Sequence, residues 1–322
     1  MIVITGGAGF IGSSLAKIFH PEEIIIIDTF NNKEQKLYLN EFLGARLVNL
    51  SESRFVLEKF KNKINFFYHL GANSATDQNI LSETINLNIF WSQYFWDFCS
   101  KNNIPFVYAS SAATYGDGQK GFSDELDIYE LKKIKLYNFY GWSKMYFDIF
   151  ALSQAKIGNS PPIWYGLKFF NVYGVNEFHK KNQCSVLHPF LKQLHTSGKI
   201  KLFKSSNKDY LDGEQKRDFV SVNFCIEFIK NLKKTKIKSG LLNVGTGVAK
   251  TFISFANDIM NVSKKNGKIE FIDMPKNLED HYQYYTKSEN TKTSEVHKLL
   301  VNYDYLEDLK NISKSIMNQI DE

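Results

Sequence analysis

The chain has 322 residues and a mass of 37.2 kDa, which is the size of one large domain or two ordinary ones. With 43% hydrophobic and 23% charged residues, its composition is that of a globular protein and excludes a repeat array, a disulfide miniprotein and a disordered tail. The net charge of +6 is carried by lysines scattered along the chain, and arginine occurs only at Arg46, Arg54 and Arg217. Because arginine is the usual reader of phosphate and guanine, we expect no nucleic-acid partner.

The positions of the cysteines and the hydropathy of the chain indicate the cellular compartment. Cys99, Cys184 and Cys225 are odd in number, far apart and without metal-ligand spacing, so we expect structural thiols and no metal site. The first residues, MIVITGG, are apolar for one strand length only and do not make a signal peptide. No run approaches the ~18 apolar residues of a membrane span. We therefore expect a soluble cytoplasmic protein with no membrane partner.

Short apolar runs alternate with longer segments of helical periodicity in the N-terminal half, as is typical of a parallel sheet covered on both faces. The apolar runs predict strands at Ile2–Thr5, Ile24–Asp28, Leu47–Leu50, Phe66–Leu70, Phe106–Ala109 and Gly166–Asn171. The periodic segments predict helices at Gly12–Phe19, Phe55–Lys61, Glu83–Lys101 and Tyr140–Ala155. This alternation predicts an α/β fold with a Rossmann-type doubly wound parallel sheet.

After Val172 the pattern loosens. Loops rich in Lys, Asn, Ser and Gly are predicted around Asn176–Asn182 and Lys204–Gln215, and a helix and strand follow at Val222–Leu232 and Leu241–Val244 before a helical C-terminus. We expect a dinucleotide-binding domain made of residues 1–171 plus about 219–246. A smaller C-terminal α/β substrate-binding domain is expected from about 172–218 plus 247–322.

The segment ITGGAGFIGSS places Gly6, Gly9 and Gly12 between the first predicted strand and the first predicted helix. Gly6 permits a tight turn, Gly9 allows the backbone to approach a pyrophosphate, and Gly12 allows the helix to pack closely on the strand. The helix N-terminus then offers free N–H groups to the phosphates. Asp28 closes the second strand, where an acidic residue holds a ribose hydroxyl. The sequence therefore predicts a site for a nicotinamide dinucleotide.

The choice between NAD and NADP rests on the residues around Asp28. Its negative charge favours NAD, because it would repel a 2′-phosphate. Lysines follow it at once, and Lys36 or Arg54 can pair with that phosphate. The lysines can equally form a solvated loop. We expect NADP as the cofactor, with NAD as the alternative.

Tyr140 and Lys144 stand four residues apart in YGWSK, so they share one face of the predicted helix. Ser111, in VYASSAATYG, follows a strand and emerges at the carboxyl edge of the sheet, where ligands of open α/β folds bind. An adjacent ammonium and an oxidised nicotinamide both favour the tyrosine anion. We expect Tyr140 to be the acid–base residue and Lys144 both to tune it and to hold the nicotinamide ribose.

The segments GGAGFIG, ASSAATYG, YGWSK and FNVYG together resemble the extended short-chain dehydrogenase/reductase family, which includes nucleotide-sugar epimerases and dehydratases. The residues that follow FNVYG, together with GEQKRDFV and HYQYYT, are most similar to the ADP-heptose 6-epimerase branch, and the similarity runs from Met1 to about Tyr305. The resemblance implies an NAD(P)-dependent isomerase that inverts C6 of an ADP-sugar by transient oxidation. It also implies a homo-oligomer, since members are often pentameric.

By the same resemblance Ser111, Tyr140 and Lys144 are the catalytic serine, tyrosine and lysine, and Lys180 is a second acid–base residue. Lys181 competes with Lys180, because Val175 and Asn176 replace the Pro-Arg pair usual after FNVYG. The expected cofactor-binding residues are Gly6, Gly9, Phe10, Ile11, Gly12, Asp28, Thr29, Lys36, Arg54, Leu70, Gly71, Ala72, Asn88, Lys144 and Val172. The expected substrate-binding residues are Asn171, Asn182, His188, Phe203, Arg217 and Tyr282. Asn88 and Asn171 can alternatively brace local backbone.

Two other functions remain open from the sequence. A UDP-sugar 4-epimerase shares every N-terminal motif, whereas a 4,6-dehydratase needs an acidic pair where Ala112 and Ala113 stand. A silent dinucleotide-binding scaffold on the same fold is a different class. The intact trio of Ser111, Tyr140 and Lys144 disfavours the scaffold.

Overall fold

The computed structural model describes residues 1–74, 81–279 and 282–321. The side chains of Lys36, Leu37, Lys181, Asn182, Asn277 and Asp321 also lie outside the description. The cofactor role predicted for Lys36, the substrate role predicted for Asn182 and the competing role of Lys181 therefore concern side chains outside the described part of the chain.

Seven parallel strands form the central sheet, in the order β11-β6-β5-β4-β1-β2-β3. They are β1 Ile2–Thr5, β2 Ile24–Asp28, β3 Arg46–Asn49, β4 Phe66–His69, β5 Phe106–Ser111, β6 Trp164–Phe169 and β11 Gly240–Val244. The chain extends from β1 toward β3 on one side and from β4 toward β11 on the other. The strand order thus reverses between β1 and β4, and ligands of open α/β sheets bind at the carboxyl ends beside such a reversal.

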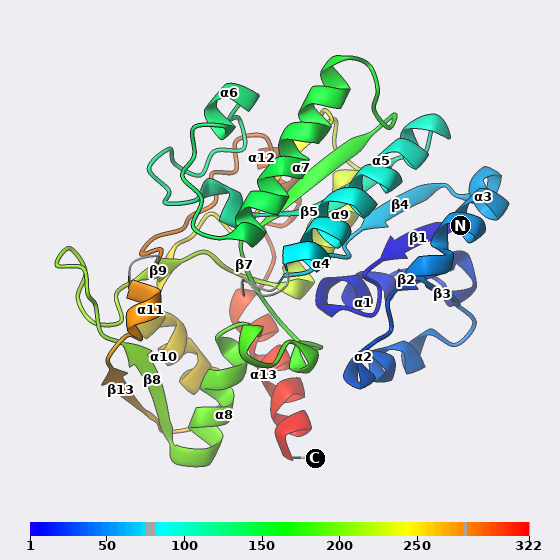
Figure 1. Ribbon diagram of the computed structural model, residues 1–322. Helices are drawn as coiled ribbons and strands as arrows, with labels where there is room; N and C mark the ends of the chain where they lie inside the picture. The colour runs from blue at the N-terminus through cyan, green and yellow to red at the C-terminus, as the bar shows by residue number, and fades with distance from the viewer. Residues whose placement is uncertain (75–80, 280–281, 322) are drawn as a thin grey trace.

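Helices cover both faces of this sheet (Figure 1). They are α1 Phe10–Ala16, α2 Lys33–Tyr38, α3 Ser53–Phe60, α4 Leu81–Ile85, α5 Trp91–Lys101, α7 Phe139–Lys156 and α9 Val222–Leu232. Ile4 and Ile26 pack in one buried cluster with Phe228 of α9, whereas Val3 and Trp96 of α5 belong to another. Because neighbouring strand residues point to opposite faces, both faces are buried. The predicted doubly wound α/β fold is confirmed.

A second group of elements lies beyond the sheet, toward the lower left of Figure 1. Three two-stranded sheets pair β7 Asn171–Tyr173 with β10 Phe219–Ser221, β8 Lys199–Phe203 with β13 Lys268–Ile272, and β9 Lys216–Arg217 with β12 Lys250–Thr251. The helices there are α8 Leu187–Ser197, α10 Phe252–Val262, α11 Lys276–Glu279 and α13 Tyr305–Asp321. Two further helices lie in the upper part of Figure 1, where α6 Ile128–Leu131 contacts α7 and α12 Ser294–Leu299 contacts α9. Leu191 of α8, Phe255 of α10 and Ile316 of α13 share a third buried cluster. The predicted domain boundaries stay a prediction.

The helix predicted at Glu83–Lys101 is divided, because the π-helical turn η6, Asn86–Phe90, separates α4 from α5. Within the described ranges, no helix combines the length and the apolar character that crossing a membrane requires.

Candidate active site

A cavity of about 810 Å³ lies at the carboxyl edge of the sheet, where the strand order reverses. Most residues predicted from the glycine loop and the catalytic motifs line it together. They are Gly6, Gly9, Phe10, Ile11, Gly12, Asp28, Thr29, Leu70, Gly71, Ala72, Ser111, Tyr140, Lys144, Val172 and Lys180. Segments far apart in the sequence therefore contribute to one site.

The glycine loop can exist only with glycine at two of its positions. Gly6 has φ +67°, and a Cβ there would lie 2.5 Å from the Cα of Gly71. A Cβ on Gly12 would lie 2.0 Å from the carbonyl oxygen of Gly6, so the first turn of α1 packs directly on the loop. Gly9 is the N-cap residue of α1 and, because it lacks a side chain, forms no side-chain cap hydrogen bond. The N–H groups of α1 are thus available to a pyrophosphate, and the loop fits a dinucleotide.

Asp28 ends β2 beside this loop. Its Oδ2 accepts a hydrogen bond from the Ala8 amide at 3.0 Å, and its Oδ1 accepts one from the Thr29 amide at 2.8 Å. Burial raises the pKa of the Asp28 carboxyl, while these backbone donors lower it. The carboxylate is therefore held against the glycine loop, at the position where a ribose hydroxyl is expected.

Tyr140 stands in the first turn of α7, which Asn138 caps by accepting a hydrogen bond from the Gly141 amide at 2.8 Å. Burial raises the pKa of Tyr140, and a hydrogen bond with the Ser111 side chain lowers it. Ser111 itself is the last residue of β5 and the N-cap of the short turn η7, Ala112–Tyr115. The carboxyl end of β5 and the start of α7 thus bring the two hydroxyls together.

Lys144 lies one helical turn after Tyr140, as the spacing predicts. Its Nζ donates to the Ala109 carbonyl at 2.9 Å and lies 5.9 Å from the centroid of the Tyr140 ring. Burial lowers the pKa of Lys144 to about 8. A lysine held in this way can donate to a ribose hydroxyl and can also stabilise a tyrosine anion.

Lys180 belongs to the turn η8, Phe178–Gln183, and lines the same cavity. Its Nζ lies 3.2 Å from Glu177 Oε2 and 4.1 Å from the centroid of the Phe10 ring. Glu177 is fully buried and also accepts hydrogen bonds from the Ser185 amide, the Ser185 hydroxyl and the Gly174 amide. A second titratable group is therefore held in the cavity by a buried carboxylate.

Two predicted cofactor residues lie elsewhere and do not line this cavity. The Arg54 guanidinium lies 5.2 Å from the Trp91 ring centroid and 4.8 Å from that of Tyr94. Asn88 is 1% exposed, and its side chain accepts from the Asn73 amide at 2.8 Å and donates to the Asn73 carbonyl at 2.9 Å. This geometry favours the alternative in which Asn88 braces backbone that leads from the cavity.

The predicted substrate residues with described side chains do not line this cavity either. Arg217 lies 5.2 Å from the ring centroid of Tyr282, and Phe203 packs edge-on against the same ring at 6.5 Å. The three side chains therefore form a cluster of their own. Asn171 accepts a hydrogen bond from Thr286, and the buried His188 bonds the Gly174 carbonyl.

Sequence reasoning missed His69, which ends β4 and lines the cavity. Its Nδ1 lies 2.6 Å from Thr5 Oγ1 and its Nε2 lies 2.8 Å from Ser92 Oγ. Burial, and secondarily the charge of Lys144, lower the pKa of His69 to about 3, so it is neutral near pH 7. Its position at the carboxyl end of a buried strand, like that of Asp28, was a usable signal.

Comparison with known proteins agrees with this geometry. Residues 2–245 match the model of the NAD dependent epimerase/dehydratase family, and the chain belongs to that family. It therefore uses a nicotinamide cofactor, and the resemblance read from its motifs is confirmed.

The similarity to curated proteins is more specific than membership of this family. The chain is 36% identical to the ADP-L-glycero-D-manno-heptose-6-epimerase of Fusobacterium nucleatum, with 92% of each chain covered. It is 33% identical to the enzyme of that name from Nitratidesulfovibrio vulgaris, with 89% of each covered. The crystal structure of the Helicobacter pylori enzyme of that name aligns with a TM-score of 0.77 at 25% identity, covering 98% of this chain and 96% of that one. A Bacillus cereus UDP-glucuronic acid 4-epimerase with bound NAD shares the fold, with a TM-score of 0.76 at 20% identity and 99% of each chain covered.

Proposed function

We propose that the chain is an ADP-L-glycero-D-manno-heptose 6-epimerase, an isomerase of nucleotide-sugar metabolism that serves lipopolysaccharide core synthesis. The proposal rests mainly on one observation. The glycine loop, Asp28 and the group Ser111, Tyr140 and Lys144 all line the same cavity. The relatives that cover about nine-tenths of the chain carry this name. A UDP-sugar 4-epimerase is the second candidate, because it needs the same cavity residues.

The residues of the cavity fit the roles that such an enzyme needs. The glycine loop and the start of α1 would hold the cofactor's pyrophosphate, Asp28 a ribose hydroxyl, and Lys144 the nicotinamide ribose. When bound, the nicotinamide supplies reversible oxidation of the substrate carbon, so that a ketone forms and is reduced again on its other face.

Acid–base chemistry belongs to the chain itself. Tyr140 removes the proton from the hydroxyl that is oxidised, with Ser111 as its hydrogen-bond partner and Lys144 stabilising its anion. Inversion exposes a second face of the substrate and calls for a second group. Lys180 fills this role, because it lies in the same cavity and is held by Glu177.

We infer NADP as the preferred cofactor, with NAD as the alternative. Asn32 and Gln35, which lie on either side of Lys33 at the start of α2, line the same cavity as Asp28. The sequence of that segment carries Lys33 and Lys36, and a lysine there is proposed to pair with a 2′-phosphate. Arg54, which is stacked on α5, is left out of this proposal. Parallel titrations with NADP and NAD test it, and tighter binding of NAD would reverse the preference.

Arg217, Tyr282 and Phe203 are proposed to receive the substrate's nucleotide diphosphate, since a buried guanidinium beside an aromatic ring suits an adenosine diphosphate. The two-domain division, the cytoplasmic location and the homo-oligomeric state stay predictions. Light scattering on purified protein would measure the last.

Incubation with ADP-D-glycero-D-manno-heptose tests the activity, with the configuration at C6 followed by proton NMR. We expect a mixture of the two C6 epimers, formed without added oxidant. Tyr140→Phe should lower the rate by about 10²–10⁴-fold while the bound dinucleotide is retained. Tyr146→Phe, on the same helix but 41% exposed, is the matched control and should keep the full rate.

Parallel incubations with UDP-glucose and UDP-N-acetylglucosamine separate the candidates. Inversion at C4 of either, with none at C6 of the ADP-heptose, would establish the 4-epimerase instead. Binding of dinucleotide without turnover of any of these sugars would leave only the scaffold.

A further inference from the structure

Lys168 of β6 and Asp148 of α7 form an ion pair inside the protein. Nζ and Oδ2 are 3.4 Å apart, and the side chains are 1% and 0% exposed. Burying two opposite charges sacrifices the hydration of both, and an apolar pair of similar volume is often at least as stable. The pair therefore points to a purpose other than stability.

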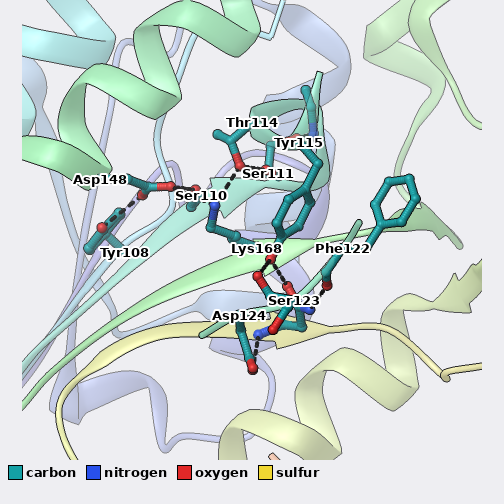
Figure 2. A network of polar contacts seen from close by, with 12 residues as sticks. Tyr108, Ser110, Ser111, Thr114, Tyr115, Phe122, Ser123, Asp124, Asp148 and Lys168 are labelled. Carbon is teal, nitrogen blue, oxygen red and sulfur yellow. Dashed lines mark hydrogen bonds and ion pairs between the residues drawn. The ribbon is translucent and has the colours of Figure 1, made fainter. Parts of the chain in front are cut away.

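The hydrogen-bond and ring partners of the pair are neutral groups. The Asp148 carboxylate accepts hydrogen bonds from the Tyr108 hydroxyl at 2.9 Å and the Ser110 hydroxyl at 2.8 Å. Lys168 donates to Thr114 Oγ1 at 2.8 Å, and its ammonium lies 4.4 Å from the centroid of the Tyr115 ring. Figure 2 shows these groups gathered around the pair. Through these hydrogen bonds the two charged side chains hold the backbone segments that their partners belong to.

That backbone is the segment that carries Ser111. Ser110 precedes it, and Thr114 follows it and donates from its hydroxyl to the Ser111 carbonyl at 2.7 Å. The Ala113 amide donates to Ser111 Oγ at 3.1 Å. Asp148 thus holds the residue on one side of Ser111, and Lys168 holds a residue on the other (Figure 2).

The pair also fixes the helix that carries Tyr140. Asp148 lies one turn after Lys144 and two turns after Tyr140 on α7, so the three share one face. Its bonds to Tyr108 and Ser110 attach this face to β5. A shift of α7 along β5 would break them and separate Tyr140 from Ser111 at the same time.

The charged and polar groups near Tyr140 and Lys144 come from several elements. On α7 itself are Lys144 and Asp148, β5 contributes Ser111 and Tyr108, and β4 contributes the neutral His69 near Lys144. Asp124 and Lys292 lie close enough to influence Lys168. The negative charge of Asp148 raises the pKa of Tyr140, which opposes its use as a base. Lys168 forms the ion pair with this carboxylate.

We propose that Lys168 and Asp148 are positioning residues of this site. They hold Ser111 and Tyr140 in register, and Lys168 cancels the negative charge that Asp148 would otherwise present to Tyr140. The inference rests on the proposed acid–base role of Tyr140. It assigns the pair no contact with substrate or cofactor.

Titration of Tyr140 in dinucleotide-loaded protein tests this without any substrate, so its failure is separate from that of the proposed activity. Near-ultraviolet difference spectra of each protein against its own Tyr140→Phe counterpart isolate this one phenol. We expect Lys168→Met to move the midpoint up by about one pH unit, since an uncompensated charge nearby contributes on the order of that much. Lys168→Arg keeps the charge and should leave the midpoint where it is.

The double variant Lys168→Met with Asp148→Asn removes both charges but keeps an amide oxygen for one hydroxyl partner. Its Tyr140 midpoint should return to the wild-type value, while kcat for the ADP-heptose falls about tenfold with KM unchanged, because the register is loosened. If Lys168→Met is poorly folded, the fall in kcat of the double variant at unchanged KM still tests the positioning role. A Lys168→Met midpoint equal to that of wild type, or a double variant that fails to restore the midpoint, would overturn the proposal.

Discussion

Protonation of His69, which lines the cavity, affects the free energy of unfolding of the whole chain. The ring is fully buried between Thr5 and Ser92, and its pKa is lowered to about 3 by burial first and by Lys144 second. In the unfolded chain a histidine has a pKa of about 6.5. The unfolded state therefore binds one more proton than the folded state between these two values. This contribution to stability is fully present above about pH 6.5 and is lost as the pH falls toward 3.

Replacement of His69 by Asn should reduce the acid sensitivity of folding. The wild-type free energy of unfolding should fall between pH 6.5 and pH 4 by up to about 3 kcal/mol more than that of the variant, at about 1.4 kcal/mol per pH unit. Urea unfolding at a series of pH values measures both slopes. His20→Asn, which removes a surface histidine before β2, is the control and should keep the wild-type slope. Equal slopes for His69→Asn and wild type would show that the ring is protonated in the folded state.

The η8 turn carries Lys180, and Glu177 anchors it. With four donors around one buried carboxylate, the turn is held mainly through a single residue. Glu177→Gln keeps the size but removes the charge, so the Lys180 ammonium loses its anion. We expect kcat for epimerisation to fall at least tenfold with dinucleotide content unchanged. Glu58→Gln, which breaks an exposed pair with Lys61, should change nothing, and an active Glu177→Gln would argue against Lys180 as the second base.

The π-helical turn η6 carries Asn88, whose side chain contacts two separate segments of the chain. It places Asn88 between the Asn73 backbone and the Ser143 hydroxyl, and so joins α4 and α5 to both the cofactor segment and α7. Asn88→Ala should weaken dinucleotide binding about tenfold and cost about 1–3 kcal/mol of stability, because partly buried backbone groups of Asn73 lose these bonds to the Asn88 side chain. Fluorescence titration and thermal unfolding measure the two effects. Asn102→Ala, which removes one bond to the Phe98 carbonyl at the end of α5, should leave the affinity unchanged.

How far the elements could be predicted depends on how buried they are. The strand Ile24–Asp28 and the helix Val222–Leu232 have the predicted bounds, because a continuous apolar run and a strong helical period leave no alternative. The strands β8 and β13, KIKLF and KIEFI, alternate charged with apolar residues and pair with each other only at long range. Alternation of charged with apolar residues is the local sign of a half-buried strand, so these two strands could have been expected from the sequence. Their pairing with each other could not, because they lie far apart along the chain.

The residues of the site also differ in how far they could be predicted from the sequence. The glycine loop and the trio Ser111, Tyr140 and Lys144 could be predicted, because their spacing alone places them on a turn, a strand end and a helix face. The Lys168–Asp148 pair could not, since it joins residues twenty positions apart on different elements. A charged residue inside an apolar strand was its only trace in the sequence. Asn88 was expected at the cofactor, and the π turn that directs it to the Asn73 backbone has no sequence signature.

On the scale of the whole molecule, Asp218 links the central sheet to the second group of elements. Its buried carboxylate accepts hydrogen bonds from the Thr246 amide and hydroxyl, the Gly247 amide and the Ser288 amide. The loop after β11, the strand pair at Arg217 and the segment near residue 288 therefore meet at one residue. We expect the two groups to unfold together rather than in two steps.

Calorimetry should accordingly show a single unfolding transition, whose Tm rises when the cofactor binds. At a dinucleotide concentration of about 100 times Kd, binding adds about 2.7 kcal/mol, which for a chain of 322 residues corresponds to a rise in Tm of about 4 °C. Adenosine monophosphate, which lacks the nicotinamide half, should give a smaller rise. Two resolved transitions, of which only one responds to dinucleotide, would show that the groups unfold independently.

The strand β11 has a consequence for how the protein is made. The strand β6 gains its outer neighbour β11 only after the chain has passed through the second group of elements and returned to the sheet. The ribosome must therefore add about 75 residues after Phe169 before β11 can pair with β6. At ~5–20 residues per second this takes roughly 4 to 15 s, during which a row of unpaired backbone groups stands open on a nascent polypeptide. Slow codons between β6 and β11 would lengthen that exposure, and premature termination there would release a fragment prone to aggregate through its free edge.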